Sequence, residues 1–269
     1  MRRSFFRLIG FTGYLWLFAN SLFAQKTNPP GTIWLKDNLY IDATPVLNIH
    51  YREYYFSLKR YHYNLDSLDR FTATLPLYGA NVKAVMDIHD FPDNKDSAQL
   101  FIDKASQSPL RESLSYAKYL WDPVYNYYPL VNVDYRIATN YCRWRTAGVA
   151  MWQSFKTKDK RAEFYDSMKY RVATAAELAM AAEKFRSAKQ IRTLTAGKHR
   201  FAADIFLADA DRQFFYITGL SEIVLEIPGK PGPAAMKWNI AGKRTATIES
   251  IEKNSFANDM TFRCICEVK

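Results

Sequence analysis

The chain has 269 residues, a formal net charge of +10 and an aromatic content of 16%. This length allows one large domain or two small ones, and the aromatic content predicts many rings packed in a core or lining a groove. Beyond residue 24 no stretch is apolar enough to cross a bilayer, which excludes a protein with several membrane spans.

Residues 1–24 have the anatomy of a cleaved secretory signal peptide. The segment begins with three arginines, continues with an apolar stretch and ends with the small residue Ala24. An uncleaved membrane anchor is the alternative, but the apolar run is interrupted and shorter than the roughly 20 residues that a span needs. We therefore expect an exported protein of the periplasm or cell surface that is not transmembrane after cleavage.

Removing residues 1–24, which carry three arginines and no acid, would lower the net charge to +7. A basic cytosolic protein would suggest nucleic acid as a partner. For a basic exported protein we expect no nucleic acid, but an anionic glycan or an acidic envelope protein. An ordinary solvated surface is the alternative interpretation.

Along the mature chain, residues 32–35 and 39–41 flank a turn and predict a pair of strands. A helix follows, capped either at Thr44 with Pro45 in its first turn or later at Asn48. Its aromatic and apolar residues recur at i, i+3, i+4 and i+7, which predicts a face packed in the core. This stripe consists of Tyr51, Tyr54, Tyr55 and Leu58.

Residues 61–124 are the least regular part of the sequence. Asp87, His89 and Asp90 belong to its one cluster of acidic residues and histidine, whose oxygens suit a hard cation such as calcium. Their spacing matches no regular binding loop, and Pro92 marks a turn, so a solvated turn is the alternative. A helix is expected to end before the Asp122-Pro123 pair.

Residues 125–182 hold two units in which an extended segment leads into a helix. Pro129 forces an extended approach, and residues 130–133 predict a short buried strand. Asp134 is expected to cap the helix that follows. In the second unit, Thr174 and Glu177 have the spacing of a capping box.

The chain is basic from residue 184 to 200. We expect these cations, with the aromatic residues near 125–128, to form an exposed binding surface; the candidates are Lys189, Arg192, Lys198, Arg200, Tyr125 and Tyr127. The segments 212–220 and 221–227 predict two strands, and residues 234–269 predict two or three more.

Three cysteines, Cys142, Cys264 and Cys266, leave one odd thiol if one disulfide forms in an oxidising compartment. A bridge from Cys142 to Cys264 would close a long loop and stabilise the fold by about 4–5 kcal/mol in the chain-entropy model. Alternatively, Cys264 and Cys266 face the same way on a strand and would form a dithiol metal site.

Several segments, in this order, resemble the motifs of one protein family. Residues 41–58 read IDATPVLNIHYREYYFSL, residues 128–144 YPLVNVDYRIATNYCRW, and residues 170–182 YRVATAAELAMAA. Weaker matches to "GNVSEW" and "GFRCV" are TGLSEI at 218–223 and TFRCI at 261–265. Residues 31–269 thus resemble the formylglycine-generating enzymes, or sulfatase-modifying factors, with 61–124 as a variable insertion. The gliding-motility and secretion lipoproteins of this superfamily look most similar, although their lipid-attachment cysteine is missing here.

The resemblance implies an α+β fold, a variant of the C-type lectin fold. It also implies a disulfide between Cys142 and Cys264, because the family's helix cysteine usually pairs with the cysteine of its last motif. The oxidases of the family bind copper through two cysteines that precede this motif, and residues 227–262 contain no cysteine. Soft thiolate ligands select Cu(I), so no other residue type there replaces them.

Further departures affect positions where the family binds calcium and substrate. The proline of the "LPTE" turn is Ala173, and the tryptophan that follows is Leu178. We therefore expect a retained scaffold with a lost active site, a pseudoenzyme that acts in binding or assembly at the cell envelope without a cofactor. The alternative is a copper-dependent oxidase that converts a protein cysteine to formylglycine, using Cys264 and Cys266.

Overall fold

A computed structural model describes residues 26–61, 116–189, 191–195, 214–225, 232–238, 246–252 and 259–269. This part of the chain combines helices with small sheets, mostly antiparallel, so the expected α+β class is confirmed. No helix within these ranges is long and apolar enough to cross a membrane. The expected signal peptide, residues 1–24, lies outside them.

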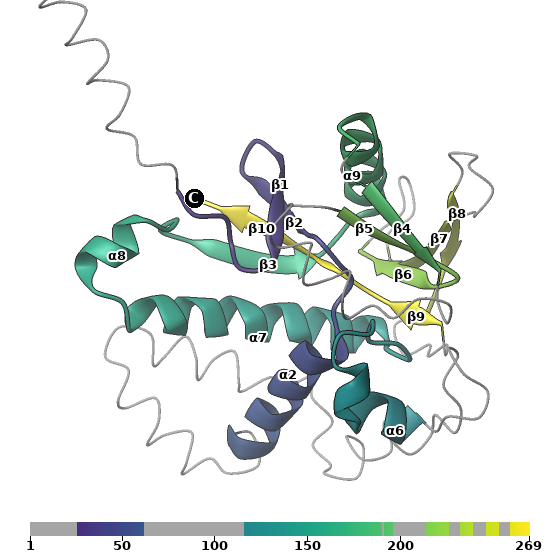
Figure 1. The fold of residues 1–269 in the computed structure, drawn as a ribbon, viewed down its shortest axis with the longest axis horizontal. Helices are drawn as coiled ribbons and strands as arrows, with labels where there is room; N and C mark the ends of the chain where they lie inside the picture. The colour runs from purple at the N-terminus through teal and green to yellow at the C-terminus, as the bar shows by residue number, and fades with distance from the viewer. Residues whose placement is uncertain are drawn as a thin grey trace, which may run out of the picture.

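The central sheet joins the two ends of the domain (Figure 1). Its strands are β1 (Thr32–Lys36), β2 (Leu39–Asp42), β10 (Cys264–Val268) and β3 (Met168–Val172), in that spatial order and all antiparallel. The predicted strand pair is therefore confirmed as the β1–β2 hairpin. Because β10 lies between β2 and β3, segments far apart in the sequence hold the sheet together.

Helices α7 (Tyr135–Ser154) and α9 (Ala175–Ser187) cover opposite faces of this sheet (Figure 1). Successive residues of a strand point to opposite faces. Accordingly, Cys264 and Cys266 join the core beneath α7, whereas Ile265 joins the core beneath α9. The sheet thus separates two apolar layers.

The helix caps predicted at Asp134 and Thr174 are present. The buried Asp134 carboxylate accepts a hydrogen bond from the Ile137 amide at 2.7 Å. At the start of α9, Thr174 and Glu177 form the reciprocal capping box, and Arg171 donates to the same Glu177 carboxylate. These caps were predictable because they depend on residues only three positions apart.

Replacing Thr174 by alanine is expected to lower the free energy of unfolding by about 1 kcal/mol, since it removes the side-chain acceptor for the Glu177 amide. Urea denaturation measures this change. Thr157→Ala is the matched control, because Thr157 caps only the exposed five-residue helix α8 (Lys158–Ala162). A larger loss for Thr157→Ala than for Thr174→Ala would contradict the prediction.

A second group of strands lies beside the central sheet. The order β8 (Ala246–Ser250), β7 (Ala234–Trp238), β6 (Ser221–Val224), β9 (Met260–Thr261) forms one small sheet. A parallel pair, β4 (Ile191–Thr195) and β5 (Phe214–Thr218), accompanies it. The strands expected at 212–220 and 221–227 correspond to β5 and β6. Strand β4 was not predicted, because its setting in the basic stretch suggested only a charged surface.

Helix α2 (Asn48–Tyr61) begins at Asn48, so the later of the two proposed starts is correct. The preceding residues do not join the helix because they bond to distant segments: Val46 donates to the Phe262 carbonyl, and its own carbonyl accepts from Leu130. Asn48 does not act as the cap. Its side-chain amide instead donates to the carbonyls of Tyr119 and Tyr125, at 3.1 and 3.0 Å.

The Asn48 amide fixes α2 against helix α6 (Tyr116–Trp121) and the short 3₁₀ helix η1 (Pro123–Tyr125). Helix α6 is the helix expected before Asp122-Pro123, so that prediction is confirmed.

The strand expected at residues 130–133 is absent. This segment is buried, as predicted, but Asn132 has a left-handed backbone with φ of 58°. A left-handed residue interrupts the extended conformation that a strand needs.

Candidate functional site

Arg145 of α7 connects the turn at Pro30 and strand β2 with the core of the domain. Its Nη1 donates to Asp42 Oδ2 at 2.8 Å and its Nη2 to the Pro30 carbonyl at 2.6 Å. The guanidinium lies 4.3 Å from the centroid of the Tyr170 ring. Asp42 also accepts a hydrogen bond from the Cys264 amide, so one carboxylate links α7 with strands β2 and β10.

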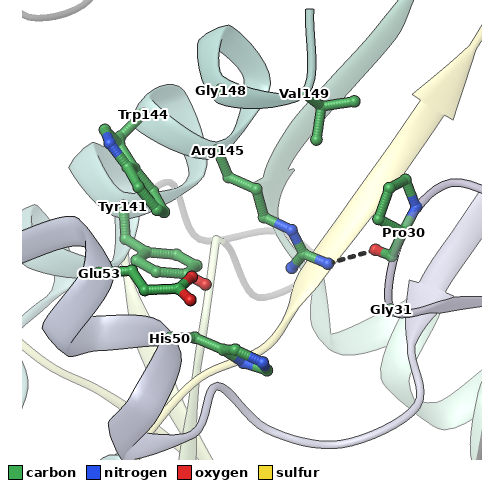
Figure 2. Close-up of a pocket in the computed structure, with 9 residues that line it drawn as sticks. All are labelled: Pro30, Gly31, His50, Glu53, Tyr141, Trp144, Arg145, Gly148 and Val149. Atoms are coloured by element: carbon green, nitrogen blue, oxygen red, sulfur yellow. Dashed lines mark hydrogen bonds between the residues drawn. The ribbon is translucent and has the colours of Figure 1, made fainter. Parts of the chain in front are cut away.

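A pocket of about 250 Å³ lies beside Arg145, between α2, α7 and the turn at Pro30 and Gly31 (Figure 2). On α7, residues spaced three, four and seven apart share one face and form a wall. Helix α2 contributes two polar side chains at i, i+3. The complete lining is Pro30, Gly31, His50, Glu53, Tyr141, Trp144, Arg145, Gly148 and Val149.

The two polar side chains from α2 reach the surface at this pocket, with much protein around the His50 ring. Desolvation by the surrounding protein, together with the Arg145 cation and partly opposed by Asp42, lowers the pKa of His50 to about 4. His50 is therefore neutral at neutral pH. Desolvation also raises the pKa of Glu53. Within the described ranges, neither side chain forms a hydrogen bond or ion pair.

Gly148 lies in the middle of α7, and a Cβ added there would meet no atom within 4 Å. Gly148→Ala is expected to raise the free energy of unfolding by about 0.5–1 kcal/mol, because glycine is a poor residue in a helix interior. Thermal and urea denaturation measure the gain. Gly31→Ala should instead destabilise, since Gly31 has φ of +74° and its Cβ would lie 3.0 Å from Arg145 Nη2. A loss of stability in Gly148→Ala would contradict the finding that an added Cβ meets no atom at this position.

The three cysteines lie in the core beneath α7. The Sγ atoms of Cys142 and Cys264 are 2.8 Å apart, as adjacent buried thiols, and the disulfide between them stays a prediction. Burial, together with the neighbouring Cys142 thiol, raises the pKa of Cys264. Burial also raises the pKa of Cys266 to about 12. The described residues contain no group of three or more histidine, cysteine or acidic side chains that would hold a metal ion.

Two weakly matching motifs meet in a buried ion pair that sequence reasoning missed. Arg263 of TFRCI is fully buried and donates two hydrogen bonds of 2.6 Å to Glu222 of TGLSEI. The same guanidinium donates to the carbonyls of Phe215 and Asp42. The sequence signal was the presence of both motifs in one resemblance, but their pairing required the three-dimensional structure.

The predicted basic surface is only partly described. Lys189 is exposed just after α9, and Arg192 lies on β4, where its side chain is not described. Lys198 and Arg200 lie outside the described residues. Lys184, at the start of the basic stretch, donates to the Trp34 and Leu35 carbonyls and therefore fixes α9 to β1.

The aromatic candidates are less accessible than expected. Tyr125 and Tyr127 are half-buried, and the Tyr125 ring centroid lies 5.5 Å from that of Tyr119 and 5.2 Å from that of Tyr128. These rings support the contact between α6 and η1. The candidate calcium ligands Asp87, His89 and Asp90 lie outside the described ranges.

Comparison of the chain with protein-family models, with curated proteins and with solved structures finds no match. The pocket, which sequence reasoning did not single out, is the site that the described side chains define. The signals that would have indicated it are His50 and Glu53, three residues apart on the polar side of the α2 stripe.

Proposed function

We propose that this protein is an exported binding or assembly protein of the cell envelope, without catalysis, on a formylglycine-generating-enzyme-like variant of the C-type lectin fold. The observation that carries the proposal is the position of the Cys264-x-Cys266 pair. Cys264 faces Cys142 in the core, and both Cys264 and Cys266 are fully buried. The two thiols that the alternative copper-dependent oxidase would use are thus packed in the core.

The chemistry of the thiols supports the same conclusion. Copper would require thiolates, whereas burial raises the pKa of both Cys264 and Cys266 and favours their protonated forms. Cys266 also lies on strand β10 opposite Tyr40 and Tyr170, so neighbouring strands enclose it. This enclosed pair of thiols does not fit a copper site.

The retained contacts support the scaffold part of the proposal. The motif residues Asp42, Glu222 and Arg263 are buried and bonded to one another's segments. Glu177 of the third motif closes the capping box at the start of α9. The residues that resemble the family therefore stabilise the fold, which is the pattern of a scaffold kept after its reaction was lost.

A disulfide map combined with a Cu(I) titration tests the absence of catalysis. The protein lacking residues 1–24 should contain a Cys142–Cys264 bond and a free Cys266, and should retain no stoichiometric Cu(I) against a competing chelator. Stoichiometric Cu(I) uptake that is lost in Cys266→Ser but kept in Cys142→Ser would overturn the proposal. It would favour the formylglycine-generating oxidase instead.

The envelope partner of this proposal is an anionic glycan or an acidic protein, bound by the basic stretch 184–200. Lipopolysaccharide and heparin are suitable probes of the glycan form. Lys189→Glu combined with Arg192→Glu should weaken binding at least tenfold, whereas Lys158→Glu combined with Lys160→Glu, on α8, should weaken it less. Equal affinities for both double variants would show that net charge alone causes the binding. They would contradict the proposal that residues 184–200 form a specific binding surface.

A further inference from the structure

We propose that the pocket between α2 and α7 binds a primary ammonium group on an aliphatic stem, such as a lysine side chain, with Glu53 as its counter-ion. The inference goes beyond the proposed function, because it depends on the pocket alone and on neither export nor the fate of the cysteines. Three features of the pocket favour such a ligand: the charges of its lining, its aromatic wall and its size.

The charge balance of the lining favours a cation. The Arg145 charge is matched by Asp42, whose Oδ2 lies 2.8 Å from Nη1, and Nη2 donates to the Pro30 carbonyl. His50 is neutral at neutral pH and adds no charge. Glu53 has no ion-pair partner in the described part of the chain. Among the described residues, its carboxylate is therefore the charge of the lining that has no counter-ion.

The neighbouring cation of α2 does not compensate Glu53. Arg52 donates instead to the Trp121 carbonyl at 2.8 Å and to the Asn126 side chain, on the α6 and η1 side of the helix. Desolvation raises the pKa of Glu53, and a bound cation beside it would reverse this effect. An ammonium group is thus the ligand that the carboxylate lacks.

The aromatic wall suits the same ligand. Figure 2 shows that the Tyr141 and Trp144 rings from α7 and the Glu53 side chain from α2 border one space. Aromatic faces attract cations, tryptophan most strongly, and they also contact an aliphatic stem. Val149 and the open surface over Gly148 extend the apolar side of the pocket.

The size of the pocket limits what can enter. Sites for drug-sized ligands usually measure about 300–1,000 Å³. At about 250 Å³, this pocket has room for one long side chain or a small amine rather than a larger cofactor. A lysine side chain combines the required charge and stem within that volume.

The test uses the folded protein lacking residues 1–24 and three probes: Nα-acetyl-lysine amide, its neutral Nε-acetylated form, and propionate. Binding is followed by chemical shifts of the tryptophan indole groups, since Trp144 lines the pocket. The lysine amide should give a saturable shift, and the Nε-acetylated form should bind at least tenfold more weakly. Equal affinity of these two probes would overturn the proposal. Preferential binding of propionate would also overturn it, because it would show that the pocket binds an anion through Arg145.

Two variants locate the site. Glu53→Gln should lower the affinity for lysine amide at least tenfold, whereas Glu183→Gln, an exposed carboxylate on α9, should leave it unchanged. Gly148→Leu should abolish binding by filling the open space. Gly148→Ala is its matched variant, because it places a smaller side chain at the same position. Unchanged affinity in Glu53→Gln would overturn the proposal even if Gly148→Leu failed to fold, because Glu53 is exposed and its replacement leaves the core intact.

Discussion

Replacing Arg263 by methionine is expected to lower the free energy of unfolding by about 3–5 kcal/mol, because the Glu222 carboxylate would remain buried without its partner. Arg263 has no exposed surface and Glu222 is 2% exposed, so water cannot replace the lost contacts. The guanidinium also satisfies the carbonyls of Phe215 and Asp42 and lies 4.4 Å from the centroid of the Phe214 ring. The loss therefore affects the small sheet and the central sheet together.

Urea denaturation of a set of variants separates the ion pair from simple packing. Adding Glu222→Leu to Arg263→Met should recover part of the lost stability, since it removes the unpaired buried charge. The matched control is Lys237→Met, which breaks the exposed Lys237–Asp259 pair and should cost at most about 1 kcal/mol. A similar small cost for Arg263→Met would show that the buried pair contributes little.

Replacing Cys142 by alanine is expected to lower the free energy of unfolding by about 4–5 kcal/mol in oxidising buffer, if Cys142 and Cys264 are bonded. The two residues are 122 positions apart, so the bond would restrict a long loop in the unfolded chain. In reducing buffer the same replacement should cost only the packing of one buried side chain. The large difference between the two buffers is the signature of the disulfide.

The matched control is Cys266→Ala, because Cys266 is equally buried on the same face of β10. Its stability should fall by about 1 kcal/mol, by the loss of a small buried group, and should respond to reductant as the original protein does. If the original protein had the same stability in both buffers, Cys142 and Cys264 would be thiols in solution. The predicted bridge would then be wrong.

The features that were predictable from sequence depend on neighbours in the chain. Asp134 and Thr174 were recognised as caps because each satisfies an amide three residues later. The start of α2 was left open between two positions, and tertiary hydrogen bonds decided it: Val46 bonds to Phe262 and to Leu130, which keeps the preceding residues out of the helix. The burial of residues 130–133 was predicted, but the left-handed Asn132 was not.

The candidate site was harder to predict, because its residues come from three separate segments. Nothing near Glu53 in the sequence indicates Trp144 or Gly148, which the packing of α2 on α7 brings to the same pocket. In contrast, the basic stretch was conspicuous in the sequence, yet Lys184 within it stabilises the contact between α9 and β1. Charge density along the chain is thus a poor guide to which cations are free to bind.

The position of β10 between β2 and β3 also determines when the chain can fold during synthesis. Asp42 and the Cys264 amide are bonded across 222 residues, and within the described residues β2 pairs with β1 and β10. During synthesis, we therefore expect the central sheet to stay incomplete until β10 has emerged, because β2 and β3 are joined only through it. A nascent chain in this state exposes apolar surface, so we expect it to need a chaperone until β10 is available.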